Sequence, residues 1–443
     1  MNPFNRKPGA NSLITPGYTF TFILVTLLFF MWALPNTLND VLIKQFMKSM
    51  ELSRLEAGFV QSAFKFGYFC LAIPAGLFMQ RLGYKAGLIT GLVFFALGCF
   101  LFLPAAMGGK YIYFLGALFI IASGLAFLEL GANSFITGLG APETSERRLN
   151  LAQSFNPIGG ITGVTVGTVF IFSGNEPTAA EILDMKAAGT YQMFLESETL
   201  RLWPTYITLG IIVLLVAIVI WFTKFPRIDT SGSAGHKGSF KALSKYPHWY
   251  NAVIAQFFYL GAQLGTWSYL ITYVQENSSM TEKQAGGLLI ANMVLFMCGR
   301  FFSTFLMKYV KPARLMGIYS CINIGLVLLV IAASRWGNVF GLHDISCWIG
   351  ICAMICTTFF MSLMYPTIFA SGVKGLGPNA KLGASVLVMS LIGGAILTPV
   401  MGLIADSSRD HAVAPAMIVP MISYIVIARF AFAGSRPRGP VYE

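Results

Sequence analysis

Long apolar stretches recur along the whole of this sequence. Runs of roughly 20 apolar residues can each cross the ~30 Å hydrocarbon layer of a membrane as a helix, and short charged breaks separate them. Of the 443 residues, 56% are hydrophobic and 11% are charged, whereas a soluble domain carries about 25% charged residues. Membrane barrels show short strands of alternating hydrophobicity instead. The sequence therefore predicts an all-α membrane protein that crosses the bilayer many times.

Twelve spans fit between the charged breaks. We expect them near residues 19–44, 55–80, 86–107, 111–139, 149–174, 202–224, 248–275, 283–308, 312–334, 345–372, 380–405 and 413–432. An even number of spans puts both termini on one side of the membrane. The loops on that side hold the excess of Lys and Arg, which marks it as cytoplasmic.

The two halves of the chain resemble each other. "NPIGGITG" (156–163) in span five corresponds to "SLIGGAIL" (390–397) in span eleven, and "NSFITGLG" (133–140) corresponds to "ASGVKGLG" (370–377). The order and the offset are nearly the same for both pairs, which indicates a parallel repeat, the architecture of major facilitator transporters. We therefore predict an N-terminal six-helix half (18–224), a Gly/Ser-rich basic cytoplasmic linker (225–247) and a C-terminal six-helix half (248–432).

Four ionisable side chains lie inside the predicted spans: Asp40, Lys65, Glu129 and Arg300. Each costs roughly 2.5–3.5 kcal/mol on insertion scales, so each is a functional candidate. A carboxylate removed from water can bind and release a proton near physiological pH. We therefore predict that Asp40 and Glu129 couple transport to protons. The alternative for Asp40 is a solvated outer helix end.

Amides and aromatic rings share helical faces with these ionisable groups. Planar amides form paired hydrogen bonds with hydroxyl groups, and aromatic faces cover the C–H face of a sugar ring. The alternative is that the amides bond across helices as structural contacts. The predicted substrate-binding residues from these stripes are Trp32, Asn36, Gln153, Asn156, Gln263, Trp267 and Tyr365.

Composition and motifs argue against other classes of protein. The net charge of +12 comes from short loops between spans, where Lys and Arg set topology, so nucleic-acid binding is not expected. The seven cysteines lie in apolar runs without a CxxC or an accompanying His, so neither a metal site nor a disulfide framework is expected. No HExxH or GxSxG motif is present, which argues against an enzyme. A sugar sensor that binds without transporting stays open as an alternative.

The loop between spans two and three, "GLFMQRLGYK" (76–85), resembles the major facilitator motif G-x-x-x-D-R-x-G-R-K. Gly76, Arg81, Gly83 and Lys85 are in register, and Gln80 replaces the usual Asp. By this resemblance, these four residues are gating and packing elements of the transporter.

Several longer stretches resemble the L-fucose permeases, sugar–proton symporters of the same superfamily. They include "FFMWALPNTLNDVLI" (29–43), "LELGANSFITGLG" (128–140), "AQFFYLGAQLGTWSYLI" (255–271) and "MYPTIFASGVKGLG" (364–377). The resemblance implies proton-coupled symport of a neutral monosaccharide, L-fucose first, by a monomer in a bacterial inner membrane. It implies no cofactor beyond the coupling proton. The alternative is proton-coupled or facilitative transport of another hexose or an amino sugar.

Carried over residue by residue, the resemblance implies protonation at Asp40 and Glu129 and a central cavity lined by Trp32, Gln153, Asn156, Trp267 and Tyr365. Two positions depart from the family. Thr37 replaces an Asn in the first-span "NNLND" pattern, so it joins the substrate-binding candidates as a change in specificity. Lys65 replaces a Tyr, and we hypothesise that it is a charge partner of Glu129 or Asp40. The alternative for Lys65 is a lysine that snorkels to the interface.

Overall fold

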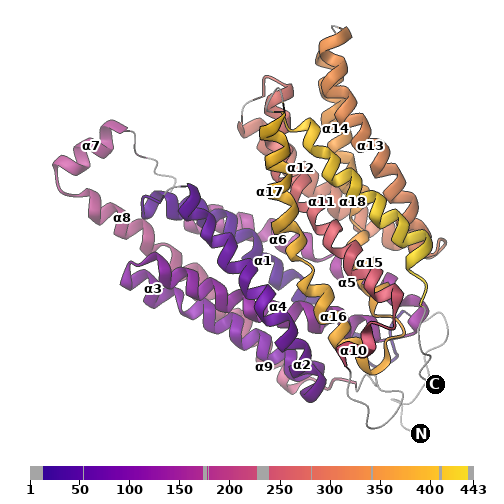
Figure 1. Ribbon diagram of the computed structural model, residues 1–443. Coiled ribbons are helices and arrows are strands. Elements are labelled where there is room, and N and C mark those ends of the chain that lie inside the picture. The colour runs from indigo at the N-terminus through magenta and orange to yellow at the C-terminus, as the bar shows by residue number, and fades with distance from the viewer. Residues whose placement is uncertain are drawn as a thin grey trace. The chain divides into compact units, whose positions relative to one another are not determined.

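The computed structural model describes residues 13–52, 54–172, 177, 179–226, 239–280, 282–340, 343–408 and 412–437, and it contains no strand within these ranges (Figure 1). The first nine helices are α1 (Thr19–Ser49), α2 (Arg54–Phe100), α3 (Phe102–Gly108), α4 (Tyr111–Gly138), α5 (Ser145–Gln153), α6 (Asn156–Val166), α7 (Ala179–Ala187), α8 (Tyr191–Leu200) and α9 (Leu202–Phe222). The others are α10 (Phe240–Leu243), α11 (Pro247–Asn277), α12 (Glu282–Leu306), α13 (Pro312–Phe340), α14 (His343–Met361), α15 (Met364–Val373), α16 (Ala380–Met389), α17 (Ile392–Ser407) and α18 (Ile418–Arg429).

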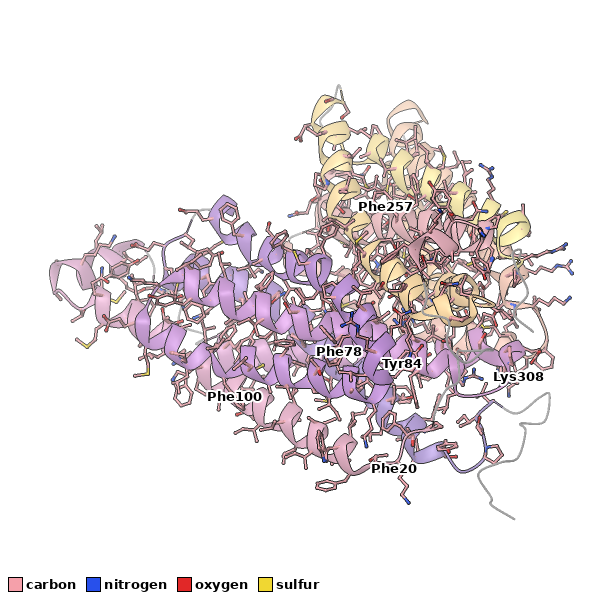
Figure 2. The ribbon with its side chains drawn as sticks, turned by 60° about the horizontal axis from the view of Figure 1, so that its bottom comes forward. Phe20, Phe78, Tyr84, Phe100, Phe257 and Lys308 are labelled. Carbon is pink, nitrogen blue, oxygen red and sulfur yellow. The ribbon has the colours of Figure 1, made fainter. Side chains whose placement is uncertain are left out.

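The number of spans follows from two details of these helices. By length and hydropathy, 10 segments within the described ranges could cross a membrane, and the segment Phe59–Gly108 is 50 residues long. It holds two predicted spans, because Gly83 has a non-helical φ of 86° and separates two helices there. Phe78 and Tyr84, labelled in Figure 2, lie on either side of this kink. The 31-residue α11 is long enough to cross but carries more polar residues. Dividing the long segment and adding α11 accounts for the twelve predicted spans.

Four of the predicted spans are interrupted within the described ranges. Span three breaks between α2 and α3, span five between α5 and α6, span ten between α14 and α15, and span eleven between α16 and α17. In spans five and ten a proline, Pro157 or Pro366, stands within the first turn of the new helix. Proline fits the first turn of a helix, because the N–H that it lacks would have no partner within the helix there, so both prolines favour a helix start at these positions.

The described chain divides into two compact units. Unit 1 contains residues 13–22, 133–157 and the described residues from 226 onward, and unit 2 contains residues 23–132 and 158–225. The end of α4 and all of α5 thus belong to the unit that holds α10 to α18. The two predicted six-helix halves stay a prediction, and residues 227–238 of the predicted linker lie outside the described ranges.

In unit 2, a stripe of glycines brings α6 close to α1. A Cβ atom at Gly159 or Gly163 would overlap backbone atoms of Phe30 or Leu34, respectively. Small residues at every fourth position let two membrane helices approach closely. This contact fixes the position of the part of α1 that carries the polar "WALPNTLND" stretch.

The connection between spans five and six contains two helices that the sequence did not predict, α7 and α8 (Figure 1). Glu198 of α8 is only 2% exposed. Its carboxylate accepts a hydrogen bond from Gln45 at 3.0 Å and pairs with Lys48 at 3.1 Å. Because Gln45 and Lys48 lie at the end of α1, this acidic segment fastens α8 to the first span.

Candidate functional site

Unit 2 brings together polar side chains from three of its spans. Side-chain hydrogen bonds join Tyr68 of α2 to Asn36 of α1 and to Glu129 of α4. Glu129 is 7% exposed. The Asn36 amide also donates to the Trp32 carbonyl at 2.8 Å, and the Trp32 ring packs on Phe29 with centroids 4.5 Å apart. A buried carboxylate is thus linked through the Tyr68 phenol to the Asn36 amide, which is bonded to the helical turn that carries Trp32.

Three other predicted residues of unit 2 are placed differently. The Thr37 hydroxyl oxygen lies 3.0 Å from the Gly160 carbonyl oxygen and within hydrogen-bonding distance of two carbonyls of its own helix. Thr37 therefore contributes to the contact between α1 and α6. Asp40 lies within α1, but its side chain is outside the described part of the structure. Lys65 is half-buried on α2, three residues before Tyr68. Its predicted pairing with Glu129 or Asp40 stays a prediction.

Unit 1 holds a second group of polar residues, at the break of span five. Gln153 is the last residue of α5, and its amide donates to the Asn133 side chain at 2.8 Å. The Asn133 amide in turn reaches the Tyr365 hydroxyl at 3.5 Å, a long contact. These three side chains come from spans four, five and ten, and all are buried.

Arg300 of α12 lies at the centre of this second group. Its Nη1 donates to the Gln153 carbonyl at 2.6 Å and its Nε to the Ser362 carbonyl at 3.0 Å. The phenols of Tyr259 and Tyr365 lie close enough to interact with its charge. On its other side the guanidinium stacks over the Phe296 ring, 4.6 Å from the centroid.

Aromatic contacts extend the group along α11 and α12. The Trp267 ring meets Phe296 edge to face, with centroids 5.2 Å apart. The ring centroids of Tyr259 and Tyr365 are 6.1 Å apart. The Trp267 indole nitrogen and the Tyr259 hydroxyl oxygen are buried. Aromatic rings with polar tips at a buried site are typical of sugar and cofactor pockets.

Sequence reasoning missed some members of this group. Tyr259, Phe296 and Asn133 are not among the predicted site residues. Tyr259 follows Gln256 by three residues and Phe296 precedes Arg300 by four, so the helical spacing of polar groups would have found both. Of the remaining predicted residues, Asn156 begins α6 and Gln263 lies on α11, and both are half-buried.

The predicted gating loop lies in unit 2. Gly83 supplies the positive φ that turns the chain, a conformation that costs glycine least. The Lys85 ammonium donates to the Trp221 carbonyl at 2.7 Å, at the end of α9. A cation is favoured at a helix C-terminus. Gly76 is buried within α2 and Arg81 is exposed. The loop is therefore fastened to the sixth span, and its role as a gate stays a prediction.

The two groups suit different tasks. The Asn36–Tyr68–Glu129 group offers a buried carboxylate that can hold a proton and is hydrogen-bonded to a phenol. The group around Arg300 offers amide, phenol and indole surfaces of the kind that bind a polyhydroxylated ring. A common chamber containing both groups stays a prediction.

Comparison with known proteins agrees with this picture. The pattern of the Major Facilitator Superfamily matches residues 20–380. The chain is 42% identical to the L-fucose-proton symporter of Escherichia coli (strain K12) over 94% of this chain and 93% of that protein. It is 31% identical to the glucose/galactose transporter of Brucella abortus, over 98% of each.

Solved structures give the same relationship. The crystal structure of the transporter FucP in the outward conformation matches with a TM-score of 0.82 and 40% identity, over 94% of this chain and 98% of that one. The predicted fold and the predicted resemblance are therefore confirmed. This chain belongs to the major facilitator superfamily and, within it, to the family of the L-fucose-proton symporters.

Proposed function

We propose that this protein is a secondary active transporter that carries L-fucose together with a proton by alternating access. The observation that supports this most is the identity of 42% to an L-fucose-proton symporter over nearly the whole chain, together with a buried carboxylate and an amide–aromatic group.

In this proposal, Glu129 and Asp40 bind the coupling proton. Trp32, Asn36, Gln153, Asn156, Gln263, Trp267 and Tyr365 bind the sugar, and Thr37 adjusts its specificity through the contact between α1 and α6. The two halves of the protein rock around the binding site to expose it to each side in turn. The proton is the coupling ion, and the transport step needs no other cofactor.

We further propose that the protein works as a monomer in a bacterial inner membrane with both termini in the cytoplasm. The excess of Lys and Arg on the side of the termini supports this orientation. Lys308, which follows the end of α12 (Figure 2), is one of these exposed basic residues.

The proposal is tested with the purified protein in proteoliposomes. Counterflow of a panel of labelled sugars identifies the substrate, and we expect L-fucose to exchange fastest. An inward proton gradient should drive accumulation of that sugar, and collapsing the gradient should abolish accumulation. Fastest counterflow of glucose, galactose or N-acetylglucosamine would favour the alternative substrates. Accumulation that does not depend on the proton gradient would refute proton coupling.

A further inference from the structure

Arg300 is a buried cation whose hydrogen-bond partners are neutral. It is 4% exposed, and its guanidinium donates to the backbone carbonyls of Gln153 and Ser362. Among the described side chains, it forms no ion pair with a carboxylate. Burying a charge without an ionic partner costs free energy. The presence of two carbonyls that offset this cost therefore needs an explanation.

Both carbonyls lack their normal helical donor for the same reason. In an α-helix the carbonyl of residue i accepts from the N–H of residue i+4. Four residues after Gln153 stands Pro157, and four residues after Ser362 stands Pro366. Proline has no N–H, so each proline leaves one carbonyl at the helix break without a donor. Arg300 supplies donors to both of these carbonyls with one side chain.

The two breaks belong to different halves of the predicted repeat. Gln153 lies in span five, whereas Arg300 and Ser362 lie in spans eight and ten. We propose that Arg300 is a positioning residue for transport, which ties the break of span five to the break of span ten and thereby sets Gln153 and Tyr365 for the sugar. The proposal rests on the proposed transport function.

Two further contacts in unit 1 join spans five and ten. Together with the Arg300 link they form a row of contacts, which we call the seam. Glu146 pairs with Lys374 at 3.2 Å, and the Asn150 amide donates to the Thr367 hydroxyl at 3.1 Å. Residues 146, 150 and 153 fall on one face of a helix, at i, i+4 and i+7. The seam therefore runs from an ion pair at the end of α15, through a neutral hydrogen bond, to Arg300.

The geometry requires arginine in particular. The planar guanidinium presents donors in fixed directions and stacks on an aromatic ring, whereas a lysine ammonium is a compact, strongly hydrated point charge. Lys at position 300 could approach one carbonyl but could not hold both carbonyls while lying over Phe296. Arg300→Lys therefore keeps the charge and removes the bridge.

The test uses the full-length protein with Arg300→Lys and Arg300→Gln. Hydrogen exchange of backbone amides should rise in peptides covering 145–155 and 360–374, because the seam opens more often. The KM for the transported sugar in counterflow should rise on the order of tenfold, the value for losing one hydrogen bond to a charged group. Hydrogen exchange of the seam amides does not depend on which sugar is carried. A wild-type protein that transports no L-fucose would therefore refute the proposed function, whereas the hydrogen-exchange result would still test the role of Arg300.

Arg148→Lys is the matched control. Arg148 is also fully buried and binds carbonyls, but those of Leu13, Ile136 and Ala141, which do not belong to span ten. This variant should raise exchange near 136–144 and leave exchange at 360–374 and the KM unchanged.

A second variant separates two roles of Arg300, which are to position the sugar-binding residues and to donate hydrogen bonds to the two carbonyls. Replacing both prolines with alanine in the Arg300→Gln background returns an N–H to each break. We expect thermal stability to recover in this triple variant while the KM stays high. Full recovery of the KM would overturn the proposal, as would wild-type seam exchange or a wild-type KM in Arg300→Lys.

Discussion

At the scale of single residues, Glu129 is the carboxylate whose surroundings are best described. It is buried, and it is hydrogen-bonded to a phenol that is itself bonded to an amide. Glu129→Gln keeps the shape and the hydrogen bond of the side chain but removes the proton site. We expect this variant to exchange sugar in counterflow at a rate near that of the wild type and to lose accumulation driven by a proton gradient.

Asp40→Asn should behave in the same way if both carboxylates take part in coupling. Ser123→Ala is the control, since Ser123 lies on the same helix as Glu129 and donates only to the Phe119 carbonyl of that helix, at 2.7 Å. Accumulation that survives in the Glu129 variant would exclude this residue as a coupling site.

Lys65 tests how charge near this carboxylate affects coupling. It stands three residues before Tyr68, on the same helical face, and Tyr68 bonds to Glu129. Because an ammonium in this region changes the electrostatic balance of the carboxylate, we expect Lys65→Tyr to shift the pH dependence of L-fucose uptake. Uptake of an acidic sugar is measured in parallel, to test whether Lys65 admits a charged substrate. Lys44→Tyr, at an exposed position of α1, is the control. Identical pH profiles and identical sugar preference would exclude both roles of Lys65.

At the scale of elements, the Glu146–Lys374 pair fastens α5 to α15 at 3.2 Å, and Ser145 donates to the same carboxylate at 3.0 Å. Glu146→Lys places two ammonium groups side by side, so we expect a loss of stability of about 1–3 kcal/mol for this partly buried pair. Thermal unfolding of the purified protein measures the loss. The swap Glu146→Lys with Lys374→Glu restores the attraction and should recover most of it.

The exposed Lys308 provides the control for this swap. Lys308→Glu changes the net charge by the same amount as Lys374→Glu but breaks no ion pair with α5, so it should leave the melting temperature near that of the wild type. A double variant no more stable than Glu146→Lys alone would show that the seam does not depend on this ion pair.

Elements with strong periodic patterns could be predicted closely, because lipid requires each of them to satisfy its backbone internally. The predicted span 202–224 compares with α9 at Leu202–Phe222, and 111–139 compares with α4 at Tyr111–Gly138. The short helices α7 and α8 could not be predicted in this way. Their sequence is mixed and acidic, and α8 is held by tertiary contacts of Glu198 rather than by a long apolar face.

The site was predictable only to the extent that side chains on one helix share a face. The polar stripes of α1, α2, α4 and α11 follow from spacing. Which stripes meet is set by tertiary packing, so the joining of Asn36, Tyr68 and Glu129 could not be read from any single span. The partners of Arg300 are backbone carbonyls, which carry no signature of their own. Pro157 and Pro366, each four residues later, are their sequence signal.

At the scale of the whole molecule, one packing detail recurs in both halves of the sequence. Gly159 of "NPIGGITG" lies against the backbone carbonyl of Phe30 on span one. Gly393 of "SLIGGAIL", the corresponding residue by sequence, lies against the backbone carbonyl of Phe257 on span seven. Each glycine thus joins the fifth span of its half to the first. A duplicated six-helix unit predicts this correspondence, because helix pairs at the same place in each copy keep the same close approach.

The repeat therefore predicts matched effects of matched substitutions. A methyl group at Gly159 or Gly393 would overlap a backbone carbonyl, which cannot move aside as a flexible side chain does, so we expect each Gly→Ala variant to lose about 1–3 kcal/mol of stability. Gly116→Ala and Gly325→Ala are the controls, since a Cβ at either position meets nothing within 4 Å. In an open helical position alanine is favoured over glycine by up to ~1 kcal/mol, so both controls should melt at or slightly above the wild-type temperature. A large loss at only one of the two interfacial glycines would mean that the halves no longer pack alike, whatever their sequences share.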